Sequence, residues 1–380
     1  MSDQIPEKET DNPHMPPWAR FGAGRIIGFL FFFLFFFGAL FLFNLYVLTR
    51  LFAMLGLRHG LPFLVFTVLS SLSFTAAMGI RNARSSIATK GYYFAAATWL
   101  GFLLYLLFAT LIYDISGWFF AYDRTIAAPA FILGTIALLA ISLAVPYFVV
   151  LREMDVPSAK PGRGLRIMHM SDIHVGSTHG PESLGKLVRM ANDTNPDLVL
   201  ITGDLADSPM PNDGNPFAAL DGLKAPTFFC LGNHEYYAGI EEVTGMLAKT
   251  KVRVLRNEAV TIDGVQVVGL DYGGAREVKE NLARLAIDRS RYVILMYHQP
   301  DGFDEASAAG VDLMLSGHTH GGQFFPFTGI NRLVWGKEYR GLHKIGEMYL
   351  YTSTGAGTWG PPMRLGTRSE IALIKVKGRN

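Results

Sequence analysis

The hydrophobic pattern of this chain changes near its middle, from long unbroken apolar runs to short runs separated by polar residues. A helix needs about 20 apolar residues to cross a hydrocarbon core of about 30 Å. Four runs reach that length, at residues 26–48, 61–80, 92–113 and 128–150. The pattern therefore predicts a transmembrane region at 26–150 with four helices, preceded by a polar segment at 1–25.

The charged residues support this prediction. Residues 26–150 contain only eight charges, all at the ends of the four runs or between them, whereas residues 151–380 contain 51. A charge in the middle of a membrane costs a few kcal/mol, so such placement is typical of membrane spans. A buried soluble helical domain is the alternative, and four consecutive runs of this length disfavour it. A cleaved signal peptide is disfavoured for the first run, which is longer than a signal core of about 7–15 residues.

Lysine and arginine are unevenly distributed around the four runs. The positive-inside rule assigns the side that is richer in these residues to the cytoplasm. One side has ten and the other has only Arg50, Arg58 and Arg124. The ten are Lys8, Arg20, Arg25, Arg81, Arg84, Lys90, Arg152, Lys160, Arg163 and Arg166. The rule predicts a multi-pass protein of the cytoplasmic membrane, with both termini and the second half of the chain in the cytoplasm.

The second half begins with a polar, Pro- and Gly-containing stretch at 151–164, which we interpret as a linker. Beyond it, at 165–380, β-type runs alternate with helical patterns, which is typical of an α/β domain. The predicted strands are 165–170, 198–201, 227–231, 265–270, 292–297, 311–315, 348–353 and 370–376. The predicted helices are 181–192, 240–249 and 278–286.

Polar residues capable of binding metals follow five of these strands. In α/β sheets, sites form beyond the carboxyl ends of strands, so we expect these residues to meet. They are Asp172 and His174, then Asp204, then Asn233 and His234, then His298, and last His318 and His320.

The residue types suit divalent ions such as Mn, Fe and Zn. Side chains two apart point the same way in an extended backbone, so Asp172 and His174 would reach one metal, and His318 and His320 would have the same geometry. The Asp204 carboxylate could bridge two cations. Two metals would clamp the attacking and leaving oxygens and lower the pKa of a bound water, giving hydroxide near neutral pH. This is chemistry for attack on phosphorus.

In order, these elements are D-x-H, G-D, G-N-H-E, a lone His and G-H-x-H, from Asp172 to His320. As a set they resemble the calcineurin-like metallophosphoesterase superfamily. The architecture is similar to its membrane-anchored branch, the transmembrane proteins with a metallophosphoesterase domain. The resemblance implies a four-layer α-β-β-α sandwich with two central sheets, here following an all-α four-helix transmembrane region, and a metal-dependent hydrolase of phosphoric ester bonds.

The resemblance also implies roles for single residues. Asp172, His174 and His320 resemble the ligands of the first metal, and Asn233, His298 and His318 those of the second, with Asp204 bridging. His234 resembles the histidine that contacts the phosphate and protonates the leaving oxygen. Asp207 matches an acid that orients this histidine in some members. In the tail at 354–371, Arg364 could hold a substrate phosphate, and an ordinary loop arginine is an equal alternative.

The net charge and the single cysteine narrow the range of possible functions. A net charge of +2 gives no reason to expect a nucleic-acid partner. The single cysteine, Cys230, lies in an apolar run and is interpreted as a core residue. We expect a phosphodiesterase or phosphatase that acts on a membrane-associated phosphate ester at the bilayer. The alternatives are a lipid-linked pyrophosphate hydrolase of the UDP-diacylglucosamine type, a catalytically inactive membrane scaffold, and a membrane sensor or carrier that the soluble domain regulates.

Overall fold

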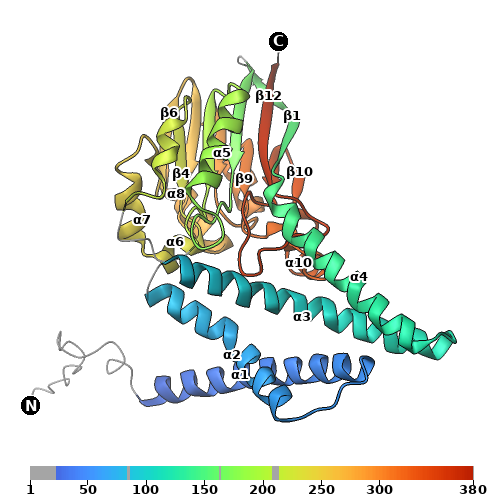
Figure 1. The fold of residues 1–380 in the computed structure, drawn as a ribbon. Coiled ribbons are helices and arrows are strands. Elements are labelled where there is room, and N and C mark those ends of the chain that lie inside the picture. The colour runs from blue at the N-terminus through green and yellow to red at the C-terminus, as the bar shows by residue number, and fades with distance from the viewer. Residues whose placement is uncertain (1–22, 84–85, 162–163, 208–213, 380) are drawn as a thin grey trace, which may run out of the picture.

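The computed structural model describes residues 23–83, 86–161, 164–207 and 214–379. Most of the polar segment predicted at 1–25 lies outside these ranges, as do Lys8, Arg20, Arg84 and Arg163 of the positive-inside argument. Within them the chain forms four long helices followed by two β-sheets with further helices (Figure 1). The four are α1 (Ala23–Met54), α2 (Leu61–Ala83), α3 (Ile87–Phe119) and α4 (Arg124–Ala144).

All four helices are long and apolar enough to cross a membrane. Their bounds differ from the predicted runs, because capping residues and proline rather than hydropathy set the ends. Ser86 caps α3 by accepting a hydrogen bond from the Thr89 N–H, so this helix begins before the apolar run does. α4 gives way to a short 3₁₀ helix at Val145–Tyr147, where Pro146 lacks the N–H that a continuing helix needs.

The first sheet has the strand order β1-β12-β2-β3-β4-β5. Its central strands β2, β3 and β4 pair in parallel, so their carboxyl ends lie at one edge of the sheet. β12 runs antiparallel to β2, and β1 runs parallel to β12. The strands are β1 (Val150–Pro161), β2 (Leu165–Met170), β3 (Leu198–Thr202), β4 (Thr227–Cys230), β5 (Arg253–Val254) and β12 (Glu370–Arg379).

The second sheet has the order β10-β11-β9-β8-β7-β6. Here β7, β8, β9 and β11 are parallel, and β6 and β10 are antiparallel edge strands. The strands are β6 (Glu258–Ile262), β7 (Val265–Gly269), β8 (Tyr292–Met296), β9 (Leu313–Ser316), β10 (Gly341–Ile345) and β11 (Met348–Thr352).

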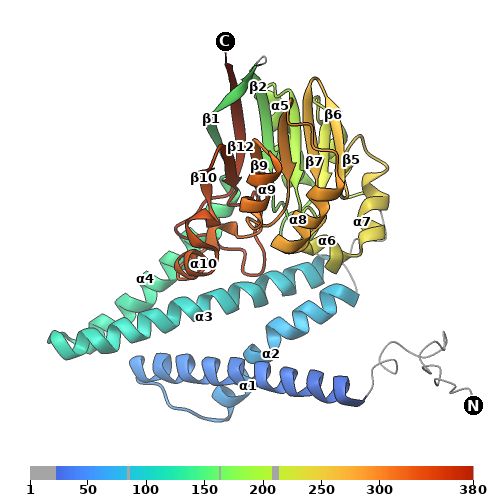
Figure 2. The same ribbon diagram turned by 180° about the vertical axis from the view of Figure 1, so that it is seen from behind.

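The two sheets pack face to face, and helices cover their outer faces (Figure 2). One core lies between the sheets and contains Leu200 and Cys230 from the first sheet with Ile294 and Leu315 from the second. A second core lies outside the first sheet, under α5 (Pro181–Asp193) and α7 (Ile240–Leu247), and a third outside the second sheet, under α8 (Ala275–Arg284) and α9 (Phe303–Ala309). The predicted four-layer sandwich is confirmed.

The prediction of a linker at 151–164 is wrong. These residues form most of β1, which pairs in register with β12 from Val150↔Glu370 to Pro157↔Lys377. Val156 is fully buried, while Arg152 and Glu153 are exposed. Charged residues and proline are typical of an edge strand as well as of a linker, and composition does not separate the two. The sandwich therefore begins at Val150, only five residues after α4.

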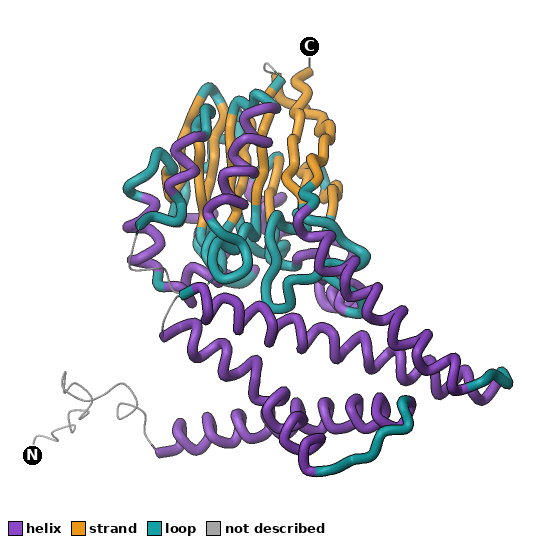
Figure 3. The backbone as a smooth tube through the Cα atoms, viewed as in Figure 1, coloured by secondary structure: helices purple, strands orange, loops and turns teal. Residues whose placement is uncertain are grey.

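The sandwich rests on the membrane-type helices through the loops at the carboxyl ends of its strands (Figure 3). The ring of Tyr105 in α3 packs edge-on against Phe324, and Met363 joins them in one apolar cluster. A Cβ at Gly101 of α3 would lie 2.4 Å from the Met363 sulfur, so glycine permits this close approach. The strand ends that carry the candidate metal ligands are thus directed toward α3.

Candidate metal centre

The loops after five strands converge on one site. Asp172 and His174 follow β2, Asp204 follows β3, and His298 follows β8. The remaining members come from α6 (Asn233–Ala238), which follows β4, and from the loop after β9. The structure brings the predicted side chains together as two clusters, Asp172–His174–His320 and Asp204–His298–His318, which are buried except for the half-buried His318. A third group, His174–Asp207–His234, adjoins the first cluster.

In the first cluster, the imidazoles of His174 and His320 face each other, with their Nε2 atoms 3.0 Å apart. The Asp172 Oδ1 atom lies 3.3 Å from His320 Nε2. Imidazole nitrogens lie about 2.0–2.1 Å from a bound zinc ion, so two that share one ion are about 3 Å apart. The cluster therefore suits one divalent ion.

In the second cluster, the His298 Nε2 atom lies 3.2 Å from Asp204 Oδ2. His318 Nδ1 lies 3.0 Å from the side-chain oxygen of Asn233. The Asp204 Oδ2 atom also lies 3.7 Å from His174 Nε2 of the first cluster. Asp204 is therefore the carboxylate that lies between the two clusters.

The electrostatics of the site favour a cation. Burial alone would lower the pKa of His298, but the neighbouring Asp204 carboxylate raises it to about 10. Burial raises the pKa of Asp204, yet the charge on His298 dominates and holds it well below the usual range. The negative charge of the buried carboxylates that raises this pKa also attracts a divalent ion, which would displace the proton from His298 on binding.

Several buried nitrogens in the site lack partners. Among the described residues, His298 Nε2, which faces Asp204 in the second cluster, has no hydrogen-bond partner. The Nδ1 atoms of His174, His234 and His320 also have none, although His174 and His320 direct their Nε2 atoms into the first cluster. Buried polar atoms are rarely left unpaired, and exceptions concentrate where an ion or ligand binds. The donor set of Asp, Asn and His fits divalent transition metals, in agreement with the sequence prediction.

The geometric reason given for the D-x-H and H-x-H pairs is wrong. Asp172 and His174 are not extended, because both have positive φ angles, 52° and 53°. His318 and His320 also have positive φ, 68° and 50°, and they belong to different clusters. The separation of His318 from His320 agrees with the roles that the family resemblance implies.

Asp207 lies in one group with His174 and with His234, the histidine that it is expected to orient, and it also contacts a membrane-type helix. Its Oδ2 atom accepts a hydrogen bond of 2.9 Å from Arg81 of α2, and its Oδ1 atom lies 3.6 Å from His174 Nδ1. Both side chains of the Arg81–Asp207 ion pair are almost fully buried. The structure therefore pairs this carboxylate with a membrane-type helix and with His174, while its orienting role toward His234 stays a prediction.

His234 lies at the mouth of the site. Its ring packs edge-on against His174, with centroids 4.6 Å apart, and against Trp359 at 5.8 Å. Its backbone N–H donates to Asp204 Oδ1 at 2.9 Å. Burial, together with the charge on His174, lowers the pKa of His234 to about 4. The ring is thus held beside both clusters without belonging to the proposed ligands.

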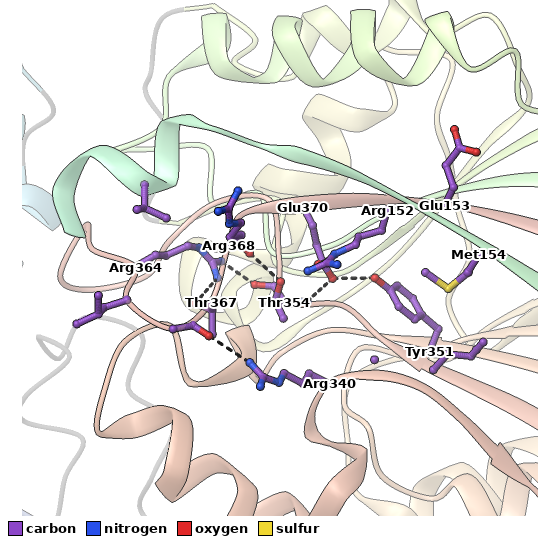
Figure 4. Close-up of a pocket in the computed structure, with 15 residues that line it drawn as sticks. Arg152, Glu153, Met154, Arg340, Tyr351, Thr354, Arg364, Thr367, Arg368 and Glu370 are labelled. Atoms are coloured by element: carbon purple, nitrogen blue, oxygen red, sulfur yellow. Dashed lines mark hydrogen bonds and ion pairs between the residues drawn. The ribbon is translucent and has the colours of Figure 1, made fainter. Parts of the chain in front are cut away.

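Arg364 does not reach the metal clusters as a phosphate ligand would. It is fully buried, and its Nη2 atom donates to the carbonyl oxygens of Thr354 at 2.6 Å and Gly357 at 2.7 Å. Its Nη1 atom donates to Thr367 Oγ1 and to the carbonyl of His320. Figure 4 shows the guanidinium directed at Thr354 and Thr367, beside a cavity of about 800 Å³ that among the described residues is lined by none of the ligand candidates. The loop-arginine alternative describes this residue.

Three features of the site were not found from the sequence. Arg81 was interpreted only as a topogenic charge, and its partner lies 126 residues away. Trp335 packs edge-on against His318 with centroids 5.4 Å apart, and Trp359 packs against His234. No motif marks these residues. The position of Trp359 in the Gly-rich tail was the only available signal.

A family model for calcineurin-like phosphoesterases matches residues 165–322. An uncharacterized metallophosphoesterase of Aquifex aeolicus is 36% identical over 247 residues, which cover 61% of this chain and 94% of that protein. The chain belongs to the calcineurin-like metallophosphoesterase family.

Two further members of the family resemble the chain over a similar span. An uncharacterized metallophosphoesterase of Campylobacter jejuni is 38% identical over 236 residues, covering 60% of this chain and 62% of that protein. A protein of Danio rerio described as a transmembrane protein with metallophosphoesterase domain is 33% identical over 234 residues, covering 56% and 53%. The chain thus matches less than two thirds of the length of these two relatives.

Proposed function

We propose that this chain is a metal-dependent hydrolase of phosphate esters that uses two divalent ions. The observation that carries the proposal is the pair of clusters that meet at Asp204. Each cluster has the ligand types for one ion, and the shared carboxylate sets them side by side. The proposed ligands are Asp172, His174 and His320 for the first ion, Asn233, His298 and His318 for the second, and Asp204 for both.

Two such ions, when bound, supply a nucleophilic water of lowered pKa and neutralise the charge on the phosphoryl oxygens. The protein side chains supply position and a proton. His234 is the proposed donor to the leaving oxygen, since its ring lies beside the first cluster. Burial leaves this ring neutral near pH 7, so the negative charge of the bound phosphate has to raise its pKa before it can donate. The hydrogen bond from its backbone to Asp204 fixes the ring relative to the metal ligands.

The chain also has four helices of membrane-spanning length, which supports a membrane protein. We propose that the sandwich lies on the cytoplasmic side, where the Lys and Arg distribution puts it. The Danio rerio relative, described as transmembrane, supports the membrane location. The proposed substrate is a phosphate ester near the membrane surface. The donor set is compatible with Mn, Fe or Zn.

The test is metal content and hydrolysis by the purified full chain. We expect about two transition-metal ions per chain and turnover of p-nitrophenyl phosphate or bis(p-nitrophenyl) phosphate. Asp204→Asn should reduce both bound metal and turnover. His234→Ala should keep the metal and lower kcat by about 10²–10⁴.

His343→Ala, which changes a histidine of β10 outside the site, is the matched control and should retain activity. Full activity in Asp204→Asn or His234→Ala would contradict the mechanism. Bound metal without turnover of either ester would instead favour the inactive scaffold.

A further inference from the structure

A largely apolar pocket of about 530 Å³ connects the candidate metal ligands with the membrane-type helices. We call it the membrane-side pocket. Its lining includes Phe43 of α1, Phe74 of α2 and Leu100 of α3 from the membrane-type helices, with Phe324 and Trp335 from the sandwich. The candidate ligands His318 and His320 also line it. Its volume lies within the range of about 300–1,000 Å³ that is usual for small-molecule sites.

The helix α10 (Phe327–Trp335) forms the rim of this pocket. Phe327, Asn331 and Trp335 line the pocket, and their spacing of four residues places them on one face of the helix. One face of this helix therefore lines the pocket, and the other face points away from the pocket.

The second face of α10 is apolar and uncovered. Ile330, Leu333 and Val334 are 45%, 87% and 68% exposed. Figures 1 and 2 both show α10 beside α3 and α4, between the sandwich and the membrane-type helices. Large apolar side chains exposed this way are stable when they lie in the interfacial layer of a bilayer. The rim of the pocket is thus placed where it would meet lipid rather than water.

We propose that the membrane-side pocket takes the hydrocarbon chain of an amphiphilic phosphate ester, with its phosphate at the metal clusters. This inference rests on the proposed function and names its substrate class. Three observations carry it: the pocket is continuous with the metal ligands His318 and His320, membrane-type helices contribute to its lining, and its rim exposes an apolar face. A water-soluble phosphate ester would leave this apolar surface uncovered.

A second apolar pocket supplies a matched control. It has a volume of about 550 Å³ and is lined by residues of α3 and α4, among them Leu138, together with Phe325 and Leu365. Among the described residues, none of its lining is a metal-ligand candidate. A chain that simply partitions among the membrane helices would use this pocket as readily as the membrane-side pocket.

The experiment compares methylphosphonate with hexadecylphosphonate as competitors of ester hydrolysis by the full chain in lipid nanodiscs. Both carry a phosphorus acid that is not hydrolysed, and they differ only in the chain. We expect the hexadecyl compound to inhibit at a concentration about tenfold or more lower. Partitioning into the bilayer would also make the longer chain the better inhibitor. Two variants therefore distinguish binding in the pocket from partitioning.

Leu100→Trp fills the membrane-side pocket, and Leu138→Trp makes the same change in the control pocket. Leu100→Trp should reduce the advantage of the hexadecyl over the methyl compound by about fivefold or more, and Leu138→Trp should leave it within about twofold. Equal effects of the two variants, or none from Leu100→Trp, would overturn the proposal. Metal content and thermal unfolding show that each variant is folded.

A hexadecylphosphonate with a photoreactive group at the end of its chain gives a readout that needs no variant and no turnover. We expect labelled peptides from α10 and from α3 around Leu100, and labelling confined to the control pocket would overturn the inference. If neither nitrophenyl ester is hydrolysed by the metal-loaded chain, the proposed function fails. The labelled peptides then still show whether the pocket binds the chain.

Discussion

Five of the seven proposed metal ligands adopt a backbone conformation that side-chain-bearing residues usually avoid. Asp172, His174, Asp204, His318 and His320 have φ between 50° and 68°. Such a left-handed conformation costs about 1 kcal/mol or more for a residue with a Cβ. Each of these residues lies just beyond the end of a strand, where the chain turns sharply. The same sharp turn directs each side chain into the site, and contacts from neighbouring loops hold the strained backbone in place.

Glu235 is one of the residues that hold these turns. Its buried carboxylate accepts hydrogen bonds from the backbone N–H groups of Asp204, Ala206 and Gly232, at 2.9, 3.0 and 2.7 Å. These contacts give Glu235 a structural role. It ties the loop after β3 to the loop after β4, and both loops carry proposed ligands.

Glu235→Gln should therefore destabilise the protein and loosen the metal site. An amide has one acceptor oxygen, and its NH₂ group would face a backbone donor, so we expect a loss of about 2–3 kcal/mol. Thermal unfolding and metal analysis would measure it. Glu241→Gln, on the exposed first turn of α7, is the matched control and should change neither quantity. Equal behaviour of the two variants would contradict the role of Glu235.

At the scale of elements, α2 is connected to the metal centre by one ion pair. Arg81, near the end of this helix, bonds to Asp207, and its guanidinium lies 4.5 Å from the centroid of the Tyr93 ring in α3. Asp207 in turn lies beside His174. A membrane-type helix thus contributes a charge that is packed against a proposed metal ligand.

Arg81→Met should be strongly destabilising, because it leaves the Asp207 carboxylate buried without its partner. Breaking such a buried pair typically costs about 3–5 kcal/mol. The double variant Arg81→Met with Asp207→Asn should recover part of the loss, since the uncompensated charge is gone. Thermal unfolding of the single and double variants measures the difference. Additive losses would show that the pair does not act as a unit.

A weaker link of the same kind joins α1 and α3. Arg50 donates from Nε to Asp114 Oδ2 at 3.0 Å, and both side chains are partly exposed. Asp114 lies within α3, which extends past it to Phe119. The two helices are therefore tied near one end by a charge pair as well as by apolar packing.

At the scale of the whole molecule, the features that could be predicted are those whose signal lies within a short stretch of sequence. Apolar runs specified the helices, and strand-end motifs specified the ligands, because both are signals within a few residues. Contacts between distant residues gave no such signal. The Arg81–Asp207 pair and the membrane-side pocket depend on how the sandwich lies on the helices, and hydropathy carries no information on that. β1 was missed because Pro157 and Lys160 suit a linker and an edge strand equally.

The arrangement of β1 has a consequence for work on the isolated soluble half. β1 covers β12, whose run Glu370-Ile-Ala-Leu-Ile374 is almost fully buried. A fragment cut at the apparent domain boundary, 165–380, would expose an apolar strand edge able to pair with another copy. We expect it to form aggregates on size-exclusion chromatography, and a fragment of 150–380 to remain more nearly monodisperse. Equal behaviour of the two would show that β1 does not protect this edge. The charged strand β1, whose composition resembles that of a linker, thus covers the edge of β12 and prevents the sheet from pairing with another copy.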